Sequence, residues 1–151
     1  MRLYIDSADI KQIERINEYY PISGVTTNPT ILVKETKHYL QALQDIRNLI
    51  GNEKELFIQV IANDAAEIVK EAEYLKARVP GETLIKIPVT EEGIKAIKEL
   101  TIQNIPTLAT TIYTPFQALI AAKAGAKYVA PYVNRIEEAT YFAPAFAAIK
   151  A

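Results

Sequence analysis

The sequence has no cysteine and only one histidine, and both shortages narrow the chemistry open to it. Without cysteine, neither a disulfide framework nor a thiolate metal site can form. His38 lies in the helical segment Lys37–Leu40. A lone histidine there is more typical of a surface residue than of a metal ligand or a catalytic base.

Long apolar runs and an excess of one charge are missing too. No run is long enough to span a membrane, and Met1–Tyr4 begin a strand rather than a signal peptide. Lysine and arginine number 17 against 18 acidic residues, for a net charge of -1. Because no basic stripe or arginine cluster occurs, nucleic acid is not an expected partner. We expect a soluble cytoplasmic enzyme or binding domain.

What the chain does have is a regular alternation of strand-like and helical segments. Its 151 residues, 50% of them hydrophobic, suffice for one domain with a core. The predicted strands are Leu3–Asp6, Val25–Asn28, Leu56–Ile61, Leu84–Val89, Thr107–Tyr113 and Tyr128–Val133. Residues suited to the helix ends between them are Ser7, Asn63, Thr90 and Thr114 as N-caps, and Gly51 and Gly125 at C-termini.

Strands that alternate with helices predict an α/β fold with a parallel sheet, either doubly wound or closed as a barrel. The phosphate-binding patterns GxGxxG and GxxxxGK[ST], which are typical of doubly wound folds, are absent. The polar residues of the strands favour the (β/α)8 TIM-barrel class.

Lys86 is the most informative of these residues, since it lies in the apolar strand Leu84–Val89. Burying an ammonium there costs several kcal/mol unless it is paired or loses its proton. A neutral, shielded amine is a nucleophile toward ketones and aldehydes, which indicates a Schiff-base lysine. Alternatively, Lys86 lies on a strand edge or a sheet face that is open to solvent.

Each of the other strands also carries a polar residue near its C-terminal half, where a parallel barrel has its active site. These residues are Asp6, Asn28, Gln59, Thr110 and Tyr132. Each has a structural alternative. Asp6 can help to cap the first helix, Gln59 can be a satisfied core amide, and Tyr132 can bury its ring. A polar group without a partner in every strand would be costly, so convergence on one site explains the set better.

Two long motifs resemble the signatures of the transaldolase family. Gly24–Leu32 is similar to the first, and Leu84–Ile94 is similar to the second, which surrounds the Schiff-base lysine. The segments Leu3–Asp6 and Lys127–Ile136 resemble the small subfamily that includes fructose-6-phosphate aldolase. The resemblance covers residues 1–136 and implies a (β/α)8 barrel that performs class I aldol chemistry with no metal or other cofactor.

The resemblance also implies residue roles. Lys86 would attack the ketose carbonyl, and Asp6 would transfer protons near the breaking carbon–carbon bond. Gln59, Thr110 and a bound water would relay protons, with Tyr132 as the acid–base partner. The substrate, a sugar phosphate or dihydroxyacetone, would contact Asn28, Thr26 and Thr27 of the first signature. Arg135 would bind its phosphate, or alternatively pair with Glu137 or Glu138.

Two positions separate the subfamilies. Similar transaldolases carry glutamate where this chain has Gln59 and phenylalanine where it has Tyr132, whereas fructose-6-phosphate aldolases resemble this chain at both. A tyrosine hydroxyl and a relay water would help to hydrolyse the imine and release free dihydroxyacetone. The resemblance therefore favours a fructose-6-phosphate aldolase over a transaldolase that transfers the dihydroxyacetone unit.

The C-terminal part departs from the family. Eight βα units need about 200 residues, whereas this chain supplies about six. The resemblance fades after Ile136, so we predict a partial barrel over 1–136 and a divergent alanine-rich tail over 137–151. An incomplete barrel leaves open sheet edges, which favours a homo-oligomer with Tyr141, Phe142 and Phe146 as contacts. These residues could instead pack on their own subunit, and the chain could be a truncated, non-catalytic relative.

Overall fold

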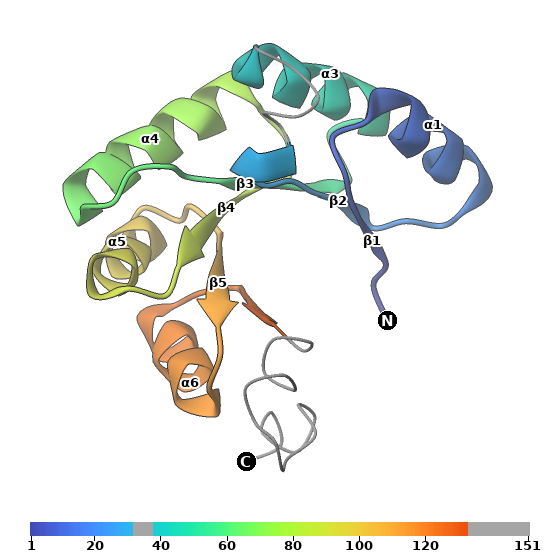
Figure 1. Cartoon of the computed structure of the whole chain (residues 1–151). Coiled ribbons are helices and arrows are strands. Elements are labelled where there is room, and N and C mark those ends of the chain that lie inside the picture. Colours follow the sequence, from blue (N-terminus) through green and yellow to red (C-terminus); the bar gives the residue numbers. More distant parts are fainter. Residues whose placement is uncertain (32–37, 133–151) are drawn as a thin grey trace. The chain divides into compact units, whose positions relative to one another are not determined.

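A computed structural model describes residues 1–31 and 38–132 of the chain, which alternate strands and helices (Figure 1). The strands are β1 (Tyr4–Asp6), β2 (Gly24–Thr26), β3 (Glu55–Gln59), β4 (Thr83–Pro88), β5 (Thr107–Ile112) and β6 (Tyr128–Pro131). The helices are α1 (Ile10–Tyr19), α3 (Tyr39–Ile50), α4 (Ala65–Arg78), α5 (Glu91–Ile102) and α6 (Pro115–Ala124). The predicted strands are thus confirmed, each with slightly different bounds.

The strand order identifies the fold class. The strands form a six-stranded sheet in the order β1-β2-β3-β4-β5-β6, and the pairs β1–β2, β2–β3 and β5–β6 are parallel. A doubly wound sheet would reverse its order at a switch point, whereas a β/α barrel places each strand beside its predecessor. The chain therefore has the βα-repeat architecture of the TIM-barrel class, as predicted.

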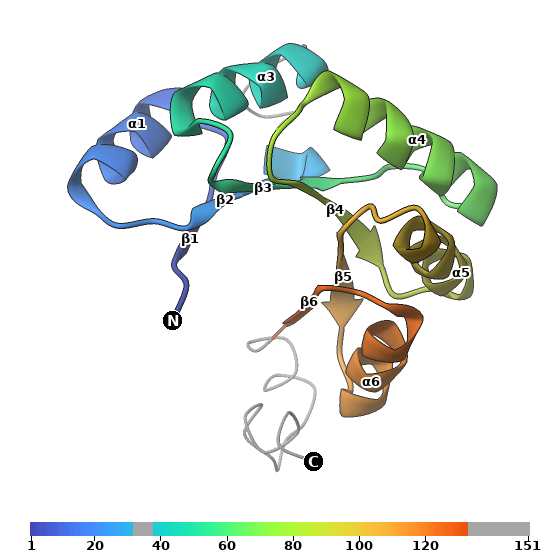
Figure 2. The same cartoon turned by 180° about the vertical axis from the view of Figure 1, so that it is seen from behind.

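The chain divides into two compact units. The first comprises Met1–Ile61 and Lys70–Ile85, and the second comprises Ala62–Val69 and the chain from Lys86 onward. In the first unit, α1 and α3 lie on the same side of β1, β2 and β3 (Figures 1 and 2). Apolar side chains from both layers are fully buried between them, among them Ile13, Val25, Leu43, Ile46 and Leu56. Their burial supplies the main stabilisation of this unit.

Gly24 at the start of β2 allows β2 and β3 to approach each other closely. A Cβ atom at this position would lie 2.0 Å from the Glu55 carbonyl oxygen on β3, which is a severe overlap with backbone. Next to it, the buried Glu55 carboxylate accepts hydrogen bonds from Arg2 (2.9 Å) and from the Tyr4 hydroxyl (2.5 Å). These contacts tie the N-terminal segment and β1 to β3.

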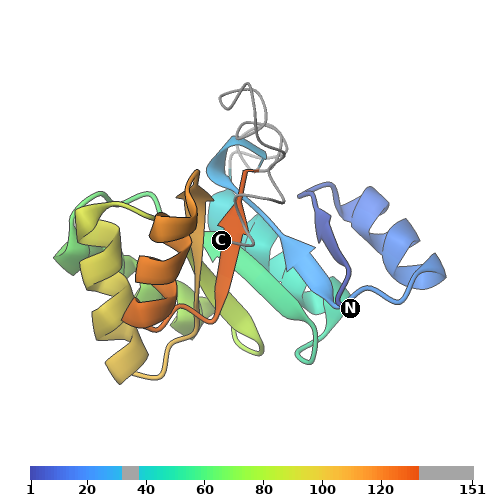
Figure 3. The same ribbon diagram turned by 90° about the horizontal axis from the view of Figure 1, so that it is seen from below.

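In the second unit, β5 and β6 lie side by side and α6 packs against them (Figure 3). Helix α6 begins with a capping box, in which Thr114 and Gln117 bond each other's backbone N–H groups and Pro115 occupies the first turn. It ends at Gly125, whose φ of 103° favours glycine. The predicted caps Thr114 and Gly125 are therefore confirmed.

Two predicted N-caps are wrong by one or two residues. Asp9, rather than Ser7, accepts the backbone N–H groups of Lys11 and Gln12 at the start of α1. Asp64, rather than Asn63, accepts the N–H of Glu67 in the first turn of α4. In both cases a carboxylate stands closer to the helix start than the predicted residue, and it also suits the positive end of the helix dipole. Thr90 caps α5 as predicted.

No helix in the described ranges, 1–31 and 38–132, is both long enough and apolar enough to cross a membrane.

Candidate active site

Lys86 lies inside β4 and is 9% exposed. Its neighbours Ile85 and Ile87 are fully buried, and so is Leu84 on the face that alternation assigns to the lysine. Both faces of this strand are covered, as is usual for a parallel strand. Lys86 therefore occupies an interior position, and the alternative of an open strand edge is wrong.

Thr110 is 6% exposed and lies near the end of β5. Its carbonyl oxygen accepts the N–H of Val89, the residue that follows β4, at 3.0 Å. Thr111 has a φ of 62°, which is rare for a β-branched residue. The β5–β6 register shifts at this point, between Ala109 and Ile112. The predicted relay residue thus lies in an irregular stretch of strand.

Tyr132 follows β6 directly. Its backbone N–H donates to the carbonyl oxygen of Ile112 at 3.0 Å, and its ring centroid lies 5.3 Å from that of Tyr113. The rings are inclined at 45° to each other. The sequence pattern predicts Tyr113 only as the last residue of a strand. Its pairing with Tyr132 depends on the register of β5 and β6, which the pattern does not show. The second unit thus holds Lys86, Thr110 and Tyr132 near the C-terminal ends of β4, β5 and β6.

The first unit holds the predicted residues of β1 and β2. The Thr26 hydroxyl donates to the Asp6 carboxylate at 2.5 Å, and these residues are paired in the β1–β2 register. The Asp6 residue is exposed, and this hydrogen bond orients its carboxylate. Thr27, by contrast, is fully buried, and its hydroxyl donates to the Phe57 carbonyl at 2.9 Å. That contact stabilises the β2–β3 pair.

Asn28 follows β2 and precedes a short helical stretch that begins at Pro29. Its side-chain oxygen accepts the N–H of Ile31 at 3.0 Å, which is the pattern of a helix N-cap. The bond fixes the orientation of the side chain, and it leaves the amide NH₂ group as the part that could donate to a substrate hydroxyl.

Gln59 ends β3, and the backbone around it is held by two helices. The Tyr39 hydroxyl on α3 donates to the Gln59 carbonyl at 3.1 Å, and the Glu71 carboxylate on α4 accepts the Ile61 N–H at 2.9 and 3.1 Å. Burial, together with the nearby Glu71 charge, raises the pKa of the Tyr39 hydroxyl above its usual value. Neither Tyr39 nor Glu71 is predictable from the sequence, because their contacts depend on tertiary packing.

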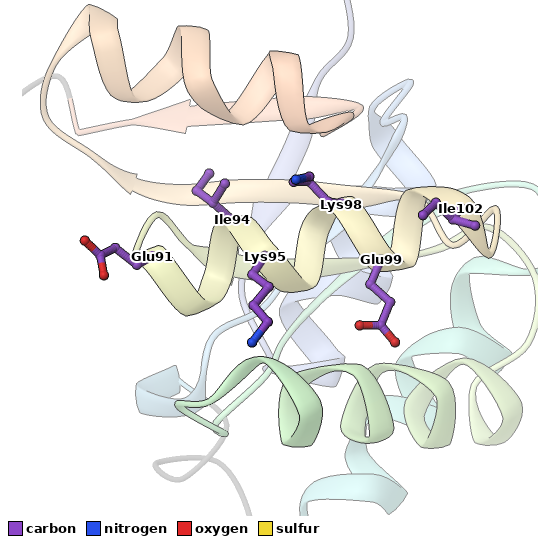
Figure 4. A pocket seen from close by; sticks show the side chains of 6 residues that line it. All are labelled: Glu91, Ile94, Lys95, Lys98, Glu99 and Ile102. Atoms are coloured by element: carbon purple, nitrogen blue, oxygen red, sulfur yellow. The ribbon is translucent and has the colours of Figure 1, made fainter.

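Arg135 lies outside the described residues. Among the residues that are described, no group of three or more histidine or acidic side chains could hold a metal ion. A hollow along α5 is lined by Glu91, Ile94, Lys95, Lys98, Glu99 and Ile102 (Figure 4). Ile94 and Lys98 point to the α6 side of the helix, and Lys95 and Glu99 point to the other. The hollow is lined by none of the predicted site residues.

A comparison with known protein families identifies the family of this chain. The sequence model of the family described as Transaldolase/Fructose-6-phosphate aldolase matches residues 3–147. The chain belongs to this family. The transaldolase/fructose-6-phosphate aldolase family consists of enzymes of the Schiff-base aldolase and transaldolase type, and the chain shares its fold class.

Solved structures of other enzymes show the same fold at low sequence identity. An enolase from Bradyrhizobium, complexed with magnesium and mandelic acid, has a TM-score of 0.61 and 18% identity over 87% of this chain and 38% of its own. A mandelate racemase/muconate lactonizing protein from Paracoccus denitrificans has a TM-score of 0.58 and 16% identity over 87% and 39%. A pyruvate carboxylase from Rhizobium etli reaches 0.59 and 15% identity over 93% and 20%. This chain thus spans less than half the length of each of these three proteins.

Proposed function

We propose that this chain is a class I, Schiff-base aldolase that cleaves and forms fructose 6-phosphate, with dihydroxyacetone and glyceraldehyde 3-phosphate as the other partners. The observation that carries the proposal is Lys86, buried in β4 within the segment Leu84–Ile94 of a transaldolase/fructose-6-phosphate aldolase family member. An amine shielded from water in a strand is a suitable nucleophile for a ketone. We place the reaction in the cytoplasm.

The proposed steps balance without an oxidant or a metal. The Lys86 amine adds to the ketose carbonyl, takes up a proton from solvent and loses water to form a protonated imine. Asp6 accepts the proton of the donor hydroxyl as the carbon–carbon bond breaks, and the electron pair of that bond moves into the imine. Glyceraldehyde 3-phosphate leaves, and the enamine of dihydroxyacetone remains on Lys86.

Release of the donor requires a proton and a water. Tyr132 protonates the enamine, and a water positioned by Gln59 and Thr110 adds to the imine carbon and returns a proton to Tyr132. The carbinolamine then collapses to free dihydroxyacetone and the Lys86 amine, and Asp6 gives its proton to solvent. Asn28, Thr26 and Arg135 hold the substrate in this scheme. Thr26 does so through Asp6, to which it donates a hydrogen bond. Thr27 contributes through the β2–β3 pair, because its hydroxyl is directed at the Phe57 carbonyl.

Gln59 and Tyr132 favour the aldolase over a transaldolase. An amide at position 59 and a phenol at position 132 support hydration of the imine, whereas a drier pocket would keep the enamine for a second aldehyde. Transfer of the dihydroxyacetone unit between sugar phosphates is the second candidate, and it uses the same lysine.

The decisive experiment is to incubate the chain with dihydroxyacetone and borohydride and to measure its intact mass. Borohydride reduces an imine to a stable amine, so we expect one added donor unit, which peptide mapping assigns to Lys86. Lys86→Met removes the nucleophile at similar volume and should abolish the adduct while the fold is kept. Lys98→Met on the exposed face of α5 is the matched control and should leave the adduct unchanged. A well-folded chain without an adduct would show that it is a non-catalytic relative.

A further inference from the structure

Between two paired positions of the β5–β6 ladder, β5 contains one residue more than β6. Ala109 pairs with Val129 and Ile112 pairs with Pro131, so β5 advances three residues while β6 advances two. Thr110 and Thr111 therefore lie opposite the single residue Ala130. Such a bulge redirects side chains and bends its strand, and bulges occur frequently next to active sites.

The bulge depends on an unfavourable backbone conformation. Thr111 has a φ of 62°, a region that glycine and asparagine enter readily but a β-branched residue rarely adopts. A conformation of this kind persists only where the surrounding structure enforces it, and such positions concentrate at functional sites.

The enforcing contacts come from both neighbouring strands. On one side, the Val89 N–H donates to the Thr110 carbonyl at 3.0 Å. Val89 comes three residues after Lys86 on the same extended segment, so this bond fixes the end of the lysine strand. On the other side, the Tyr132 N–H donates to the Ile112 carbonyl at 3.0 Å.

The extra residue also brings Tyr113 to Tyr132. Because Ile112 pairs with Pro131, the next residues in the ladder direction, Tyr113 and Tyr132, come opposite each other, and their ring centroids are 5.3 Å apart. In a regular ladder continued from Ala109, Ile112 would face Tyr132 instead. The bulge therefore decides which side chain lies beside the Tyr132 phenol.

We propose that the Thr110–Thr111 bulge is a positioning device of the aldol site, and that Tyr113 is the positioning residue for the Tyr132 ring. The inference rests on the proposed function, since it assigns the bulge the task of setting Tyr132 and Thr110 relative to the Lys86 strand. Thr111 and Tyr113 touch no reacting atom in this scheme; they act through their neighbours.

Deletion of Thr111 tests the device directly. The shortened strand can pair regularly, with Thr110 opposite Ala130 and with both flanking pairs kept, so a folded chain is expected. Because Tyr113 then stays opposite Tyr132, this variant tests the placement of Thr110, and the Tyr113 variants test the placement of Tyr132. We expect kcat for fructose 6-phosphate cleavage to fall about 100-fold, the scale of a displacement of about 1 Å, while KM changes much less. Borohydride trapping at Lys86 should persist, because the lysine itself is retained. Circular dichroism and Tm report the fold.

Matched variants separate positioning from stability. Thr111→Asn keeps a residue that tolerates positive φ, so it should keep kcat within about threefold of the wild type. Tyr113→Leu removes the ring and should lower release of free dihydroxyacetone about tenfold relative to transfer, whereas Tyr113→Phe keeps the ring and should retain the wild-type ratio. If the chain without Thr111 does not fold, the comparison of Tyr113→Leu with Tyr113→Phe still tests the proposal.

The outcomes are distinguishable. A folded deletion variant with wild-type kcat and product ratio would overturn the inference, and so would Tyr113→Leu with the wild-type ratio. Loss of turnover with retained trapping supports it. If the wild-type chain itself gives no adduct at Lys86, the proposed function fails, and this inference fails with it.

Discussion

The phenol of Tyr132 separates two chemical outcomes in the proposed reaction. Its ring lies 5.3 Å from the Tyr113 ring, and its own backbone is held by Ile112. Tyr132→Phe removes only the hydroxyl and should keep this packing. We expect release of free dihydroxyacetone to fall about 100-fold, as for loss of an acid–base group, while transfer to an added aldehyde falls less. Product ratios measured by chromatography give the result, with Tyr128→Phe at the start of β6 as the control. An unchanged ratio would remove Tyr132 from the proposed scheme.

Tyr39 links side-chain ionisation to stability. Burial and the Glu71 carboxylate raise the pKa of its hydroxyl in the folded chain above the value of an unfolded tyrosine. Above pH about 10 the unfolded chain therefore releases this proton and the folded chain retains it, so stability falls as pH rises.

Tyr39→Phe lacks this group and should lose less stability between pH 8 and pH 11 than the wild type does. Urea denaturation at the two pH values measures the difference, with Tyr20→Phe, an exposed tyrosine, as the control. If Tyr39→Phe and the wild type show equal losses, the buried hydroxyl is not the cause.

At the scale of elements, Arg47 joins the end of α3 to the strands that follow. It is 3% exposed, and its guanidinium donates to the carbonyls of Gly51 at 2.6 Å and Lys54 at 2.7 Å and to the Thr83 hydroxyl at 3.0 Å. Burial lowers the pKa of Arg47, partly offset by Glu82. The side chain thus ties the α3–β3 connection and β4 to the end of α3 through three hydrogen bonds.

Arg47→Met keeps apolar volume but removes three hydrogen bonds from a charged donor, so we expect a loss of about 3 kcal/mol in the free energy of unfolding. Arg15→Met on the exposed face of α1 should change it by less than about 0.5 kcal/mol. Urea denaturation of both variants provides the comparison. Equal stabilities would mean that water replaces the guanidinium at no cost.

Local patterns predicted the elements better than their details. Apolar runs located all six strands, and the barrel class followed once the polar strand residues were considered. The bulge was not predictable, since a threonine at positive φ carries no signal such as glycine or asparagine would give. The N-caps Asp9 and Asp64 were missed because the predicted caps, Ser7 and Asn63, lie one or two residues away. Which residue caps a helix depends on where its first turn begins.

The same limit applies to the candidate site. Lys86 could be singled out because a charge interrupts an apolar strand, and its side chain is buried there. Tyr39 and Tyr113 were not, because each owes its place to a contact with a residue distant in the sequence. The roles of Lys86, Gln59 and Tyr132 stay predictions until the adduct and the product ratios are measured.

At the scale of the whole molecule, the two end strands of the described sheet are informative. β1 and β6 end the sheet order, so each has one strand neighbour among the described elements. Both carry exposed apolar residues: Leu3, just before β1, is 50% exposed, and Val129 in β6 is 41% exposed. Apolar edge strands pair readily with other chains.

We therefore expect a homo-oligomer, with a mass by light scattering that is a multiple of the chain mass. Val129→Lys places a charge on the β6 edge and should shift the mass toward one chain. Ile102→Lys on α5, where the side chain is 82% exposed, is the control and should not. A single-chain mass at every concentration would contradict the expectation. The other predicted contacts, Tyr141, Phe142 and Phe146, lie outside the described residues.

The division of the chain into two units has a consequence for how each unit is encoded in the gene. The path passes from one unit to the other at three points, after Ile61, after Val69 and after Ile85. The last of these lies inside β4, between two fully buried isoleucines and directly before Lys86. No single cut in the gene would yield either unit whole. Neither unit is therefore a continuous module of the gene, and the lysine strand contributes residues to both.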